Sequence, residues 1–216
     1  MEKNAGVVLV AAGSGARFGR PKALVGLAGR SLLEWSAAAF EGFADRVVVL
    51  RPADLDWFDL PGWKRVPGGA RRRDSVAAGL DALDPATTTV LIHDAARPLV
   101  TAGVVERVAA ALESGAGAVV PGVPVSDTIK RVEGERVIET LERSTLVAVQ
   151  TPQGFRLDLL RRALARSDAD ATDEAALVEA LGDPVAVVPG DPANLKITRE
   201  IDLEIARILA NRGEKG

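Results

Sequence analysis

The sequence predicts an α/β protein with a Rossmann-like, doubly wound and mostly parallel sheet. Two observations lead to this prediction: short β-branched runs recur along the chain, and the stretches between them carry helix signals. A chain of 216 residues, 47% of them hydrophobic, can bury one sizeable core. We therefore expect a single domain over residues 1–216, with right-handed crossovers and a ligand crevice beyond the carboxyl ends of the strands.

Short runs rich in valine, leucine and isoleucine are the predicted strands. They cover residues 7–10, 46–50, 89–93, 118–121 and 184–188. A helix is predicted over about residues 32–40, where Ser31 and Glu34 have the spacing of a capping box. Leu33, Ala37 and Phe40 then lie along one face of this helix.

The later helices are predicted from their first turns, where hydroxyl and acidic side chains favour an N-terminus. Their expected starts are Asp74 or Ser75, Thr101, and the run Thr172-Asp173-Glu174. A last helix begins at Thr198, and its spacing predicts that Ile201, Ile205 and Ile208 face inward.

Residues 126–144 depart from this alternation. Val132 and Val137 flank Glu133-Gly134, which indicates a charged β-hairpin. Because an isolated hairpin is marginally stable in water, a projecting hairpin would pack against another subunit. The sequence leaves two alternatives: a projecting β-arm that forms a homodimer, and a hairpin folded back onto its own domain.

Composition excludes several classes of function. The net charge of −3, with cations scattered among acids, argues against a nucleic-acid binder. The absence of cysteine excludes disulfides, a thiolate nucleophile and cysteine-ligated zinc. A charged N-terminus leads directly into the first predicted strand, so we expect a cytoplasmic protein without a membrane span.

The loop from Ala11 to Lys22 follows the first strand and is the first candidate site. Its glycines let backbone N–H groups turn toward one anion, while Arg17 and Lys22 supply positive charge, as a polyphosphate requires. Phe18 at the third glycine position excludes a dinucleotide fingerprint, and the lack of Gly-Lys-Ser/Thr excludes a Walker loop. A tight turn with solvated cations is the alternative.

Two further loops follow predicted strands or lead into helices. Asp94 comes at the end of an apolar strand and is a candidate for Mg²⁺ or a ribose hydroxyl, or alternatively for a turn cap or a partner of Arg97. His93, the only histidine, is expected to be structural. The run from Gly68 to Val76 places three arginines at a helix start, which indicates an anion between them or a solvated basic run.

These segments combine with others into a set of motifs in a fixed order. The set comprises the Ala-Ala-Gly-x-Gly loop with Arg17 and Pro21-Lys22, Gly-Gly-x-x-Arg-x-x-Ser-Val, His93-Asp94-Ala95-Ala96-Arg97-Pro98, Asp127-Thr128-Ile129-Lys130-Arg131, Thr151-Pro152-Gln153, Thr172-Asp173-Glu174 and Asn194-Leu195-Lys196-Ile197-Thr198. From about Val7 to Ile208 the chain resembles the 2-C-methyl-D-erythritol 4-phosphate cytidylyltransferases.

The resemblance implies a fold of the nucleotide-diphospho-sugar transferase type and a defined reaction. CMP would pass from CTP to 2-C-methyl-D-erythritol 4-phosphate, with release of pyrophosphate and with Mg²⁺ as cofactor, in non-mevalonate isoprenoid precursor synthesis. It also implies a homodimer, in which the arm of residues 126–144 reaches the neighbouring subunit's site.

The resemblance also assigns roles to residues. Arg17 and Lys22 match the pair that stabilises the transition state. The positions that match those holding the sugar phosphate are Thr128, Arg143, Thr151 and Lys196. The nucleotide-binding positions are Ala11, Ala12, Gly13, Gly15, Gly69, Ser75, Asp94 and Ala95, with Asp94 also the candidate metal ligand.

Two other functions stay open on the sequence alone. A cytidylyltransferase for another polyol phosphate, such as ribitol 5-phosphate, would use the same fold and nucleotide loop. A non-catalytic sugar-nucleotide sensor would keep the crevice, but it would not need both Arg17 and Lys22.

Overall fold

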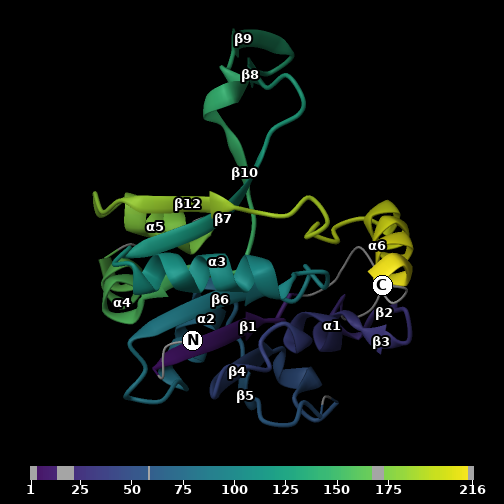
Figure 1. Cartoon of the computed structure of the whole chain (residues 1–216), viewed down its shortest axis with the longest axis vertical. Coiled ribbons are helices and arrows are strands. Elements are labelled where there is room, and N and C mark those ends of the chain that lie inside the picture. The colour runs from purple at the N-terminus through teal and green to yellow at the C-terminus, as the bar shows by residue number, and fades with distance from the viewer. Residues whose placement is uncertain (1–3, 14–21, 58, 167–172, 214–216) are drawn as a thin grey trace.

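The computed structural model describes residues 4–13, 22–57, 59–166 and 173–213 and shows a central sheet between two layers of helices (Figure 1). The sheet order is β10-β7-β11-β6-β1-β4-β5, with β12 also paired to β7. These strands are β1 (Ala5–Val10), β4 (Asp45–Leu50), β5 (Lys64–Pro67), β6 (Thr89–Asp94), β7 (Ala118–Pro124), β10 (Val147–Val149), β11 (Gln153–Arg156) and β12 (Val185–Pro189). All of the predicted strands are confirmed, whereas β5, β10 and β11 were not predicted.

The sheet is mostly parallel, as expected. β1 pairs in parallel with β4 and β6, β4 with β5, and β12 with β7. β11 runs antiparallel to both β6 and β7, and β10 is antiparallel to β7. Because the chain continues from β1 to β4 and β5 on one side and returns to β6 on the other, β1 marks the switch point of the sheet.

One hydrophobic core lies on each face of the sheet. On one face α1 (Leu32–Ala38) and α3 (Ala102–Glu113) pack against β1, β4 and β6. The other face is covered by α2 (Arg72–Asp81), α4 (Leu157–Arg166) and α5 (Glu174–Glu179).

The start of α1 confirms the predicted capping box. The Ser31 hydroxyl accepts the N–H of Glu34 at 3.2 Å, and the Glu34 carboxylate accepts the N–H of Ser31 at 2.7 Å. Leu33, Ala37 and Phe40 are all buried, as their spacing predicts.

The start of α2 differs from the prediction, and the start of α5 falls within the predicted run. α2 begins at Arg72, before Asp74, because the Asp74 carboxylate reaches back to the N–H of Arg71 at 3.1 Å from within the first turn. In α5 the cap is Asp173, which accepts the N–H of Ala176 at 3.0 Å. Thr172 lies outside the described residues.

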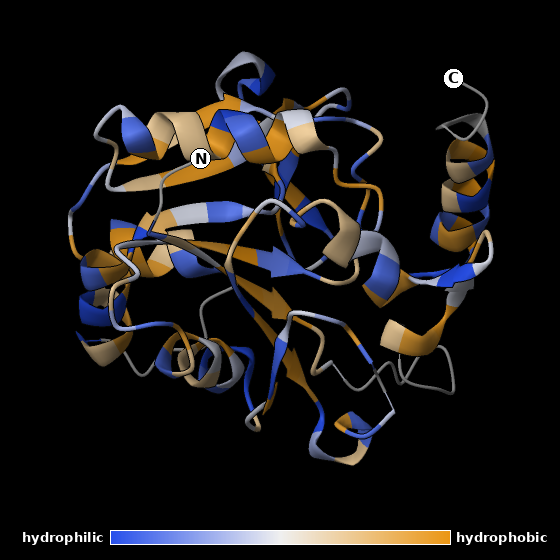
Figure 2. Cartoon of the chain, turned by 60° about the horizontal axis from the view of Figure 1, so that its bottom comes forward, coloured by the Kyte–Doolittle hydropathy of each residue, from blue (hydrophilic) through white to orange (hydrophobic). Residues whose placement is uncertain are grey.

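The predicted orientation of α6 (Glu200–Gly213) is wrong. Ile201, Ile205 and Ile208 are 53%, 43% and 57% exposed. A second stripe with equivalent spacing, Leu203, Ala206 and Ala210, is buried instead against Val25, Leu27 and Ile197 around the small β2–β3 hairpin. β2 spans Gly26–Leu27 and β3 spans Arg30–Ser31. The small side chains of Ala206 and Ala210 let the helix approach this hairpin closely. Hydrophobic residues occur on more than one side of the helix, as Figure 2 shows.

The hairpin of β8 (Lys130–Glu133) and β9 (Arg136–Thr140) stands clear of the sheet as an arm (Figure 1). Every residue of these two strands is exposed, including Val132, Val137 and Ile138. The alternative of a hairpin folded back onto its own domain is therefore wrong. Within the described ranges, no helix combines the length and the apolar character that crossing a bilayer would require.

Candidate active site

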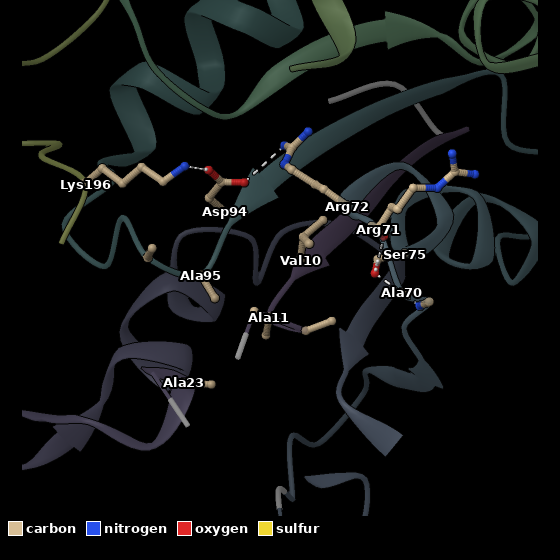
Figure 3. Close-up of a pocket in the computed structure, with 14 residues that line it drawn as sticks. Val10, Ala11, Ala23, Ala70, Arg71, Arg72, Ser75, Asp94, Ala95 and Lys196 are labelled. Carbon is tan, nitrogen blue, oxygen red and sulfur yellow. Dashed lines mark hydrogen bonds and ion pairs between the residues drawn. The ribbon is translucent and has the colours of Figure 1, made fainter. Parts of the chain in front are cut away.

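A cavity of about 400 Å³ opens where the carboxyl ends of β1 and β6 meet, at the switch point of the sheet (Figure 3). Val10 at the end of β1 is the register partner of Asp94 at the end of β6. The lining residues are Val10, Ala11, Ala12, Gly13, Ala23, Gly69, Ala70, Arg71, Arg72, Ser75, Asp94, Ala95, Ala96 and Lys196. The topology thus places the cavity where open α/β sheets bind ligands.

One wall of this cavity consists of backbone and small side chains. A Cβ on Gly68 would lie 2.5 Å from the Cβ of Ala12, so only glycine lets the loop after β5 approach the loop after β1. The Ser75 hydroxyl fixes this loop, since it accepts the N–H of Gly69 and donates to the carbonyl of Arg71, both at 3.2 Å. Ala11 donates its N–H to the Val49 carbonyl at 2.8 Å.

The opposite wall is charged. Asp94 accepts from Lys196 Nζ at 2.7 Å and from Arg72 Nη2 at 3.1 Å, so each carboxylate oxygen has a cationic partner. Burial opposes the negative charge on Asp94, but the two cations outweigh it and hold the pKa of this carboxyl well below its usual value. Asp94 is therefore ionised at neutral pH. The expected alternative of an Asp94–Arg97 ion pair is not found; Arg97 donates instead to the carbonyls of Asn194 and Val149.

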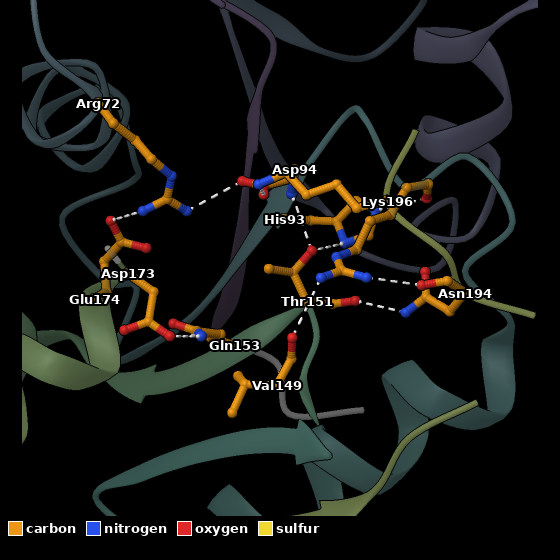
Figure 4. A network of polar contacts seen from close by, with 11 residues as sticks. Arg72, His93, Asp94, Val149, Thr151, Gln153, Asp173, Glu174, Asn194 and Lys196 are labelled. Carbon is orange, nitrogen blue, oxygen red and sulfur yellow. Dashed lines mark hydrogen bonds and ion pairs between the residues drawn. The ribbon is translucent and has the colours of Figure 1, made fainter. Parts of the chain in front are cut away.

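Arg72 links this wall to α5. Its guanidinium contacts Glu174, which is 2% exposed, as well as Asp94 (Figure 4). Burial raises the pKa of Glu174, although Arg72 partly offsets the effect. Two carboxylates on separate elements thus hold one guanidinium in a fixed position at the cavity edge.

His93 and Thr151 form a buried pair beneath Asp94. The Thr151 hydroxyl lies 3.0 Å from His93 Nδ1 and accepts the N–H of Asp94 at 3.1 Å. His93 is fully buried, and burial lowers the pKa of its imidazole to about 4. A neutral ring with both nitrogens engaged inside the protein has a structural role, as expected for this histidine.

The structure brings most of the candidate residues into one place. Those that line the cavity are Ala11, Ala12, Gly13, Gly69, Ser75, Asp94, Ala95 and Lys196. Thr128 and Arg143 lie on exposed backbone at the foot of the arm and do not line it, and Arg143 donates to the Ser126 carbonyl at 2.6 Å. Gly15 and Arg17 lie outside the described residues, and only the backbone of Lys22 is described, at the start of a 3-10 turn (Lys22–Leu24).

Arg72 and Glu174 are the members of the site that sequence reasoning missed. The run of three arginines was a signal, but its side chains diverge. Arg71 pairs with Asp74, Arg72 with Asp94 and Glu174, and Arg73 donates to the Leu164 carbonyl. Only Arg71 and Arg72 of the three line the cavity.

A switch-point cavity with a backbone wall on one side and cations on the other is typical of a nucleotide-binding α/β protein, and the comparisons place this one in the nucleotidyltransferase class. The family model for 2-C-methyl-D-erythritol 4-phosphate cytidylyltransferase matches residues 5–212. The chain belongs to this family.

Individual relatives agree with the family model. The chain is 48% identical to the 2-C-methyl-D-erythritol 4-phosphate cytidylyltransferase of Rhodococcus jostii, over 94% of this chain and 93% of that protein. It is 50% identical to a bifunctional enzyme IspD/IspF of Solidesulfovibrio magneticus over 91% of its own length, and it spans about half of that longer protein, 54%. The crystal structure of the Thermus thermophilus cytidylyltransferase superposes with a TM-score of 0.83 at 42% identity, covering 95% of this chain and 98% of that one.

Proposed function

We propose that this protein transfers CMP from CTP to 2-C-methyl-D-erythritol 4-phosphate, releasing pyrophosphate, as a step in non-mevalonate isoprenoid precursor synthesis. Family membership supports the reaction. The observation in the structure that carries it is the cavity itself, in which backbone and small side chains form one wall while Lys196 and Arg72 lie on the opposite wall. The cytoplasmic location expected from the sequence stays a prediction.

The backbone wall supports recognition of cytosine. The N–H groups of Ala11 and Gly69 are both bonded within the protein, so in our proposal the polar atoms that these residues offer to a base are their carbonyl oxygens. Carbonyl oxygens accept hydrogen bonds, which suits the amino group of cytosine and disfavours the carbonyl that uracil has in its place. Asp94 and Ala95 lie beside this wall, where we place the ribose.

The charged wall supports binding of the acceptor phosphate. Lys196 Nζ is paired with Asp94, yet its side chain is 45% exposed, so it can also face an anion in the cavity. In our proposal an oxygen of the acceptor phosphate attacks the α-phosphorus of CTP in line with the departing pyrophosphate. A phosphate monoester is already mostly dianionic at neutral pH, so the step requires no general base.

The fully buried and neutral His93 agrees with this chemistry, because it has no access to the reacting groups. The protein's contribution is then positioning and neutralisation of charge. Arg17 and Lys22, which match the transition-state pair of the family, are the residues to which we assign the α-phosphate.

The chain's own donors fit Mg²⁺ as the cofactor. No group of three histidine, aspartate or glutamate side chains gathers anywhere in the described ranges, which argues against an all-protein metal cage. Nucleotide-bound Mg²⁺ needs only one or two carboxylates in addition to phosphate oxygens and water, and Asp94 would offer one if an oxygen exchanged its Lys196 or Arg72 partner for the metal. Mg²⁺, when bound, supplies positive charge to the triphosphate.

We propose that the protein is a homodimer in which the arm of residues 126–144 completes the neighbouring site. Thr128 and Arg143 do not line the cavity of their own subunit, and the exposed valines of the arm favour burial against a second subunit.

Mixing two inactive variants tests this arrangement. Arg143→Ala and Lys196→Ala should each abolish turnover, but their mixed dimers contain one site with both residues intact. After dissociation and reassociation we expect about a quarter of wild-type activity per site. Recovery confined to the background level of the separate variants would contradict the shared site.

The reaction itself is tested by pyrophosphate release from CTP, UTP and ATP with a panel of polyol phosphates. Release only from CTP with 2-C-methyl-D-erythritol 4-phosphate is the expected result. A preference for ribitol 5-phosphate would show that the acceptor is that polyol phosphate. Equal use of the three nucleotides would refute the proposed cytosine contacts. Binding without pyrophosphate release would indicate a non-catalytic sensor.

A further inference from the structure

A chain of hydrogen bonds joins Arg97, His93, Thr151 and Asp94. Figure 4 shows His93, Thr151 and Asp94 side by side. His93 Nε2 lies 3.2 Å from the carbonyl oxygen of Arg97, and His93 Nδ1 lies 3.0 Å from the Thr151 hydroxyl. The N–H of Asp94 donates to the same hydroxyl at 3.1 Å. The chain therefore ends at the residue whose carboxylate faces the cavity.

The chemistry of these groups fixes the direction of every bond. A carbonyl oxygen can only accept, so His93 Nε2 carries the hydrogen and donates to Arg97. His93 is fully buried and both of its hydrogen-bond partners, a carbonyl and a hydroxyl, are uncharged, so the ring carries a single hydrogen and Nδ1 is an acceptor. Thr151 must then donate its hydroxyl hydrogen to His93. A lone pair of the same hydroxyl accepts from Asp94.

We infer that Thr151 is a positioning residue: its hydroxyl fixes the backbone of Asp94 and does not contact the acceptor phosphate. The Nε2–H tautomer of His93 orients this hydroxyl. A phosphate dianion has no hydrogen to donate and must be met by donors, and the only donor on the Thr151 side chain is already engaged. The inference rests on the proposed function only in placing Asp94 in the nucleotide half of the site.

Burial makes this arrangement costly to break. Thr151 is 5% exposed and His93 is 0% exposed, so water cannot replace either partner. The backbone of Thr151 is held as well, because its carbonyl accepts from Asn194 Nδ2 at 2.9 Å. A rotation of the Thr151 hydroxyl toward the cavity would leave His93 Nδ1 buried without a donor.

Nitrogen-15 NMR of the imidazole tests the inference directly, because the chain has a single histidine. We expect a protonated Nε2 and a hydrogen-bonded acceptor at Nδ1, with the Nδ1 shift unchanged when the protein is saturated with CTP and with 2-C-methyl-D-erythritol 4-phosphate. A protonated Nδ1, or an Nδ1 shift toward an unbonded acceptor when the acceptor binds, would overturn it.

The NMR experiment separates this inference from the proposed function. Backbone amide shifts report whether 2-C-methyl-D-erythritol 4-phosphate binds at all, and no change in them would count against the proposed function. The tautomer and the Nδ1 hydrogen bond are measured in the unliganded protein, so failure of one conclusion does not imply failure of the other.

A set of variants tests whether Thr151 acts through Asp94. Thr151→Val removes the hydroxyl at nearly constant volume, and we expect it to lower kcat/KM for CTP about tenfold or more, whereas Thr151→Ser keeps the hydroxyl and should stay near wild type. In an Asp94→Asn background, which retains the backbone N–H but not the charge, Thr151→Val should cost less than about twofold further.

The opposite pattern would refute the inference. If Thr151 met the acceptor directly, the effects of Thr151→Val and Asp94→Asn would multiply, and Thr151→Val would raise KM for the acceptor in either background. If Thr151→Val does not fold, as circular dichroism would show, the tautomer and Nδ1 measurements on the wild-type protein decide the question.

Discussion

Asp94 and Arg72 show how single residues of this site depend on distant parts of the chain. Lys196 is 102 positions from Asp94 in sequence, and Glu174 is 102 positions from Arg72. The position of Asp94 at a strand end was predictable, because that position follows from the apolar run before it. Its partners were not, because an ion pair between elements depends on how helices pack and leaves no local pattern.

At Arg17 and Lys22 we predict a large loss of turnover on substitution by alanine. Each is assigned to the α-phosphate, and removal of one preorganised donor from such a site typically costs about 10²- to 10³-fold, or about 3 to 4 kcal/mol. Steady-state pyrophosphate release is the measurement, with circular dichroism as the control for folding. Near-normal turnover in a folded variant would contradict the assigned roles.

His93 predicts a pH dependence of stability. Its folded pKa of about 4 lies below the 6.5 of an exposed histidine, so the unfolded chain binds a proton that the folded chain excludes. The free energy of unfolding should therefore fall as the pH decreases from 6.5, by about 2 kcal/mol at pH 5.

Urea unfolding between pH 7.5 and 5 measures this dependence, and a His93→Asn variant, which lacks the imidazole, is the control. The proton signals of the single histidine should also show no titration in that range. A titration midpoint near 6.5 in the folded protein would refute the prediction.

At the scale of elements, hydrophobic periodicity predicted the strands and helices that have a clear apolar pattern. Valine-rich strands and the capped α1 were found, whereas β5, with the sequence Lys64-Arg65-Val66-Pro67, is a charged edge strand without an apolar run. The prediction for α6 was wrong for a different reason. Two faces of this helix have hydrophobic residues at helical spacing, and only the packing against the rest of the protein decides which face is buried.

The two faces of α6 give a stability prediction. Leu203→Ala should lower the free energy of unfolding by about 2 to 5 kcal/mol, because Leu203 is 7% exposed in a packed core. Ile208→Ala, at 57% exposure, should change it by less than about 0.5 kcal/mol. Equal losses in the two variants, measured by denaturant unfolding, would show that the exposed stripe is also buried in solution.

Gly79 in α2 gives a second prediction at this scale. A Cβ there would lie 2.4 Å from Cγ1 of Val8 in the buried strand β1, and a branched core side chain cannot move away. Gly79→Ala should therefore destabilise the protein by about 1 to 3 kcal/mol despite the better helix propensity of alanine.

The matched control for Gly79 is Gly103→Ala in α3. A Cβ at Gly103 would meet only the end of the Arg107 side chain, at 3.4 Å. We expect this variant to be neutral or stabilised by up to about 1 kcal/mol. Thermal unfolding of both variants makes the comparison, and stabilisation by Gly79→Ala would contradict the packing described for α2.

At the scale of the whole molecule, the cavity is an outcome of topology. Successive strands are added on one side of β1 and then on the other, so a crevice forms at the carboxyl ends of β1 and β6. This was predictable once the α/β alternation was recognised. The projection of the arm was not fixed by the sequence, because a hairpin with exposed valines satisfies the same pattern whether it projects or folds back.

Removal of the arm tests its role in assembly. Replacing residues 127–142 with a short glycine-serine linker should leave the sheet folded, because every residue of β8 and β9 is exposed and none belongs to the hydrophobic cores. We expect sedimentation to show a monomer and pyrophosphate release to be lost. A dimer that persists without the arm would locate the interface elsewhere.

The small core around α6 connects local stability to catalysis. Ile197 is fully buried in that core and donates its N–H to the Ala96 carbonyl at 2.8 Å, and Lys196 is the residue immediately before it in the chain. Because this core is separate from the two that cover the sheet, we expect α6 and the β2–β3 hairpin to open as one cooperative unit, which hydrogen exchange would detect. Each opening of that unit would release Ile197 and with it one side of Lys196. The time for which Lys196 stays in position to bind the acceptor would then depend on a few buried side chains of α6.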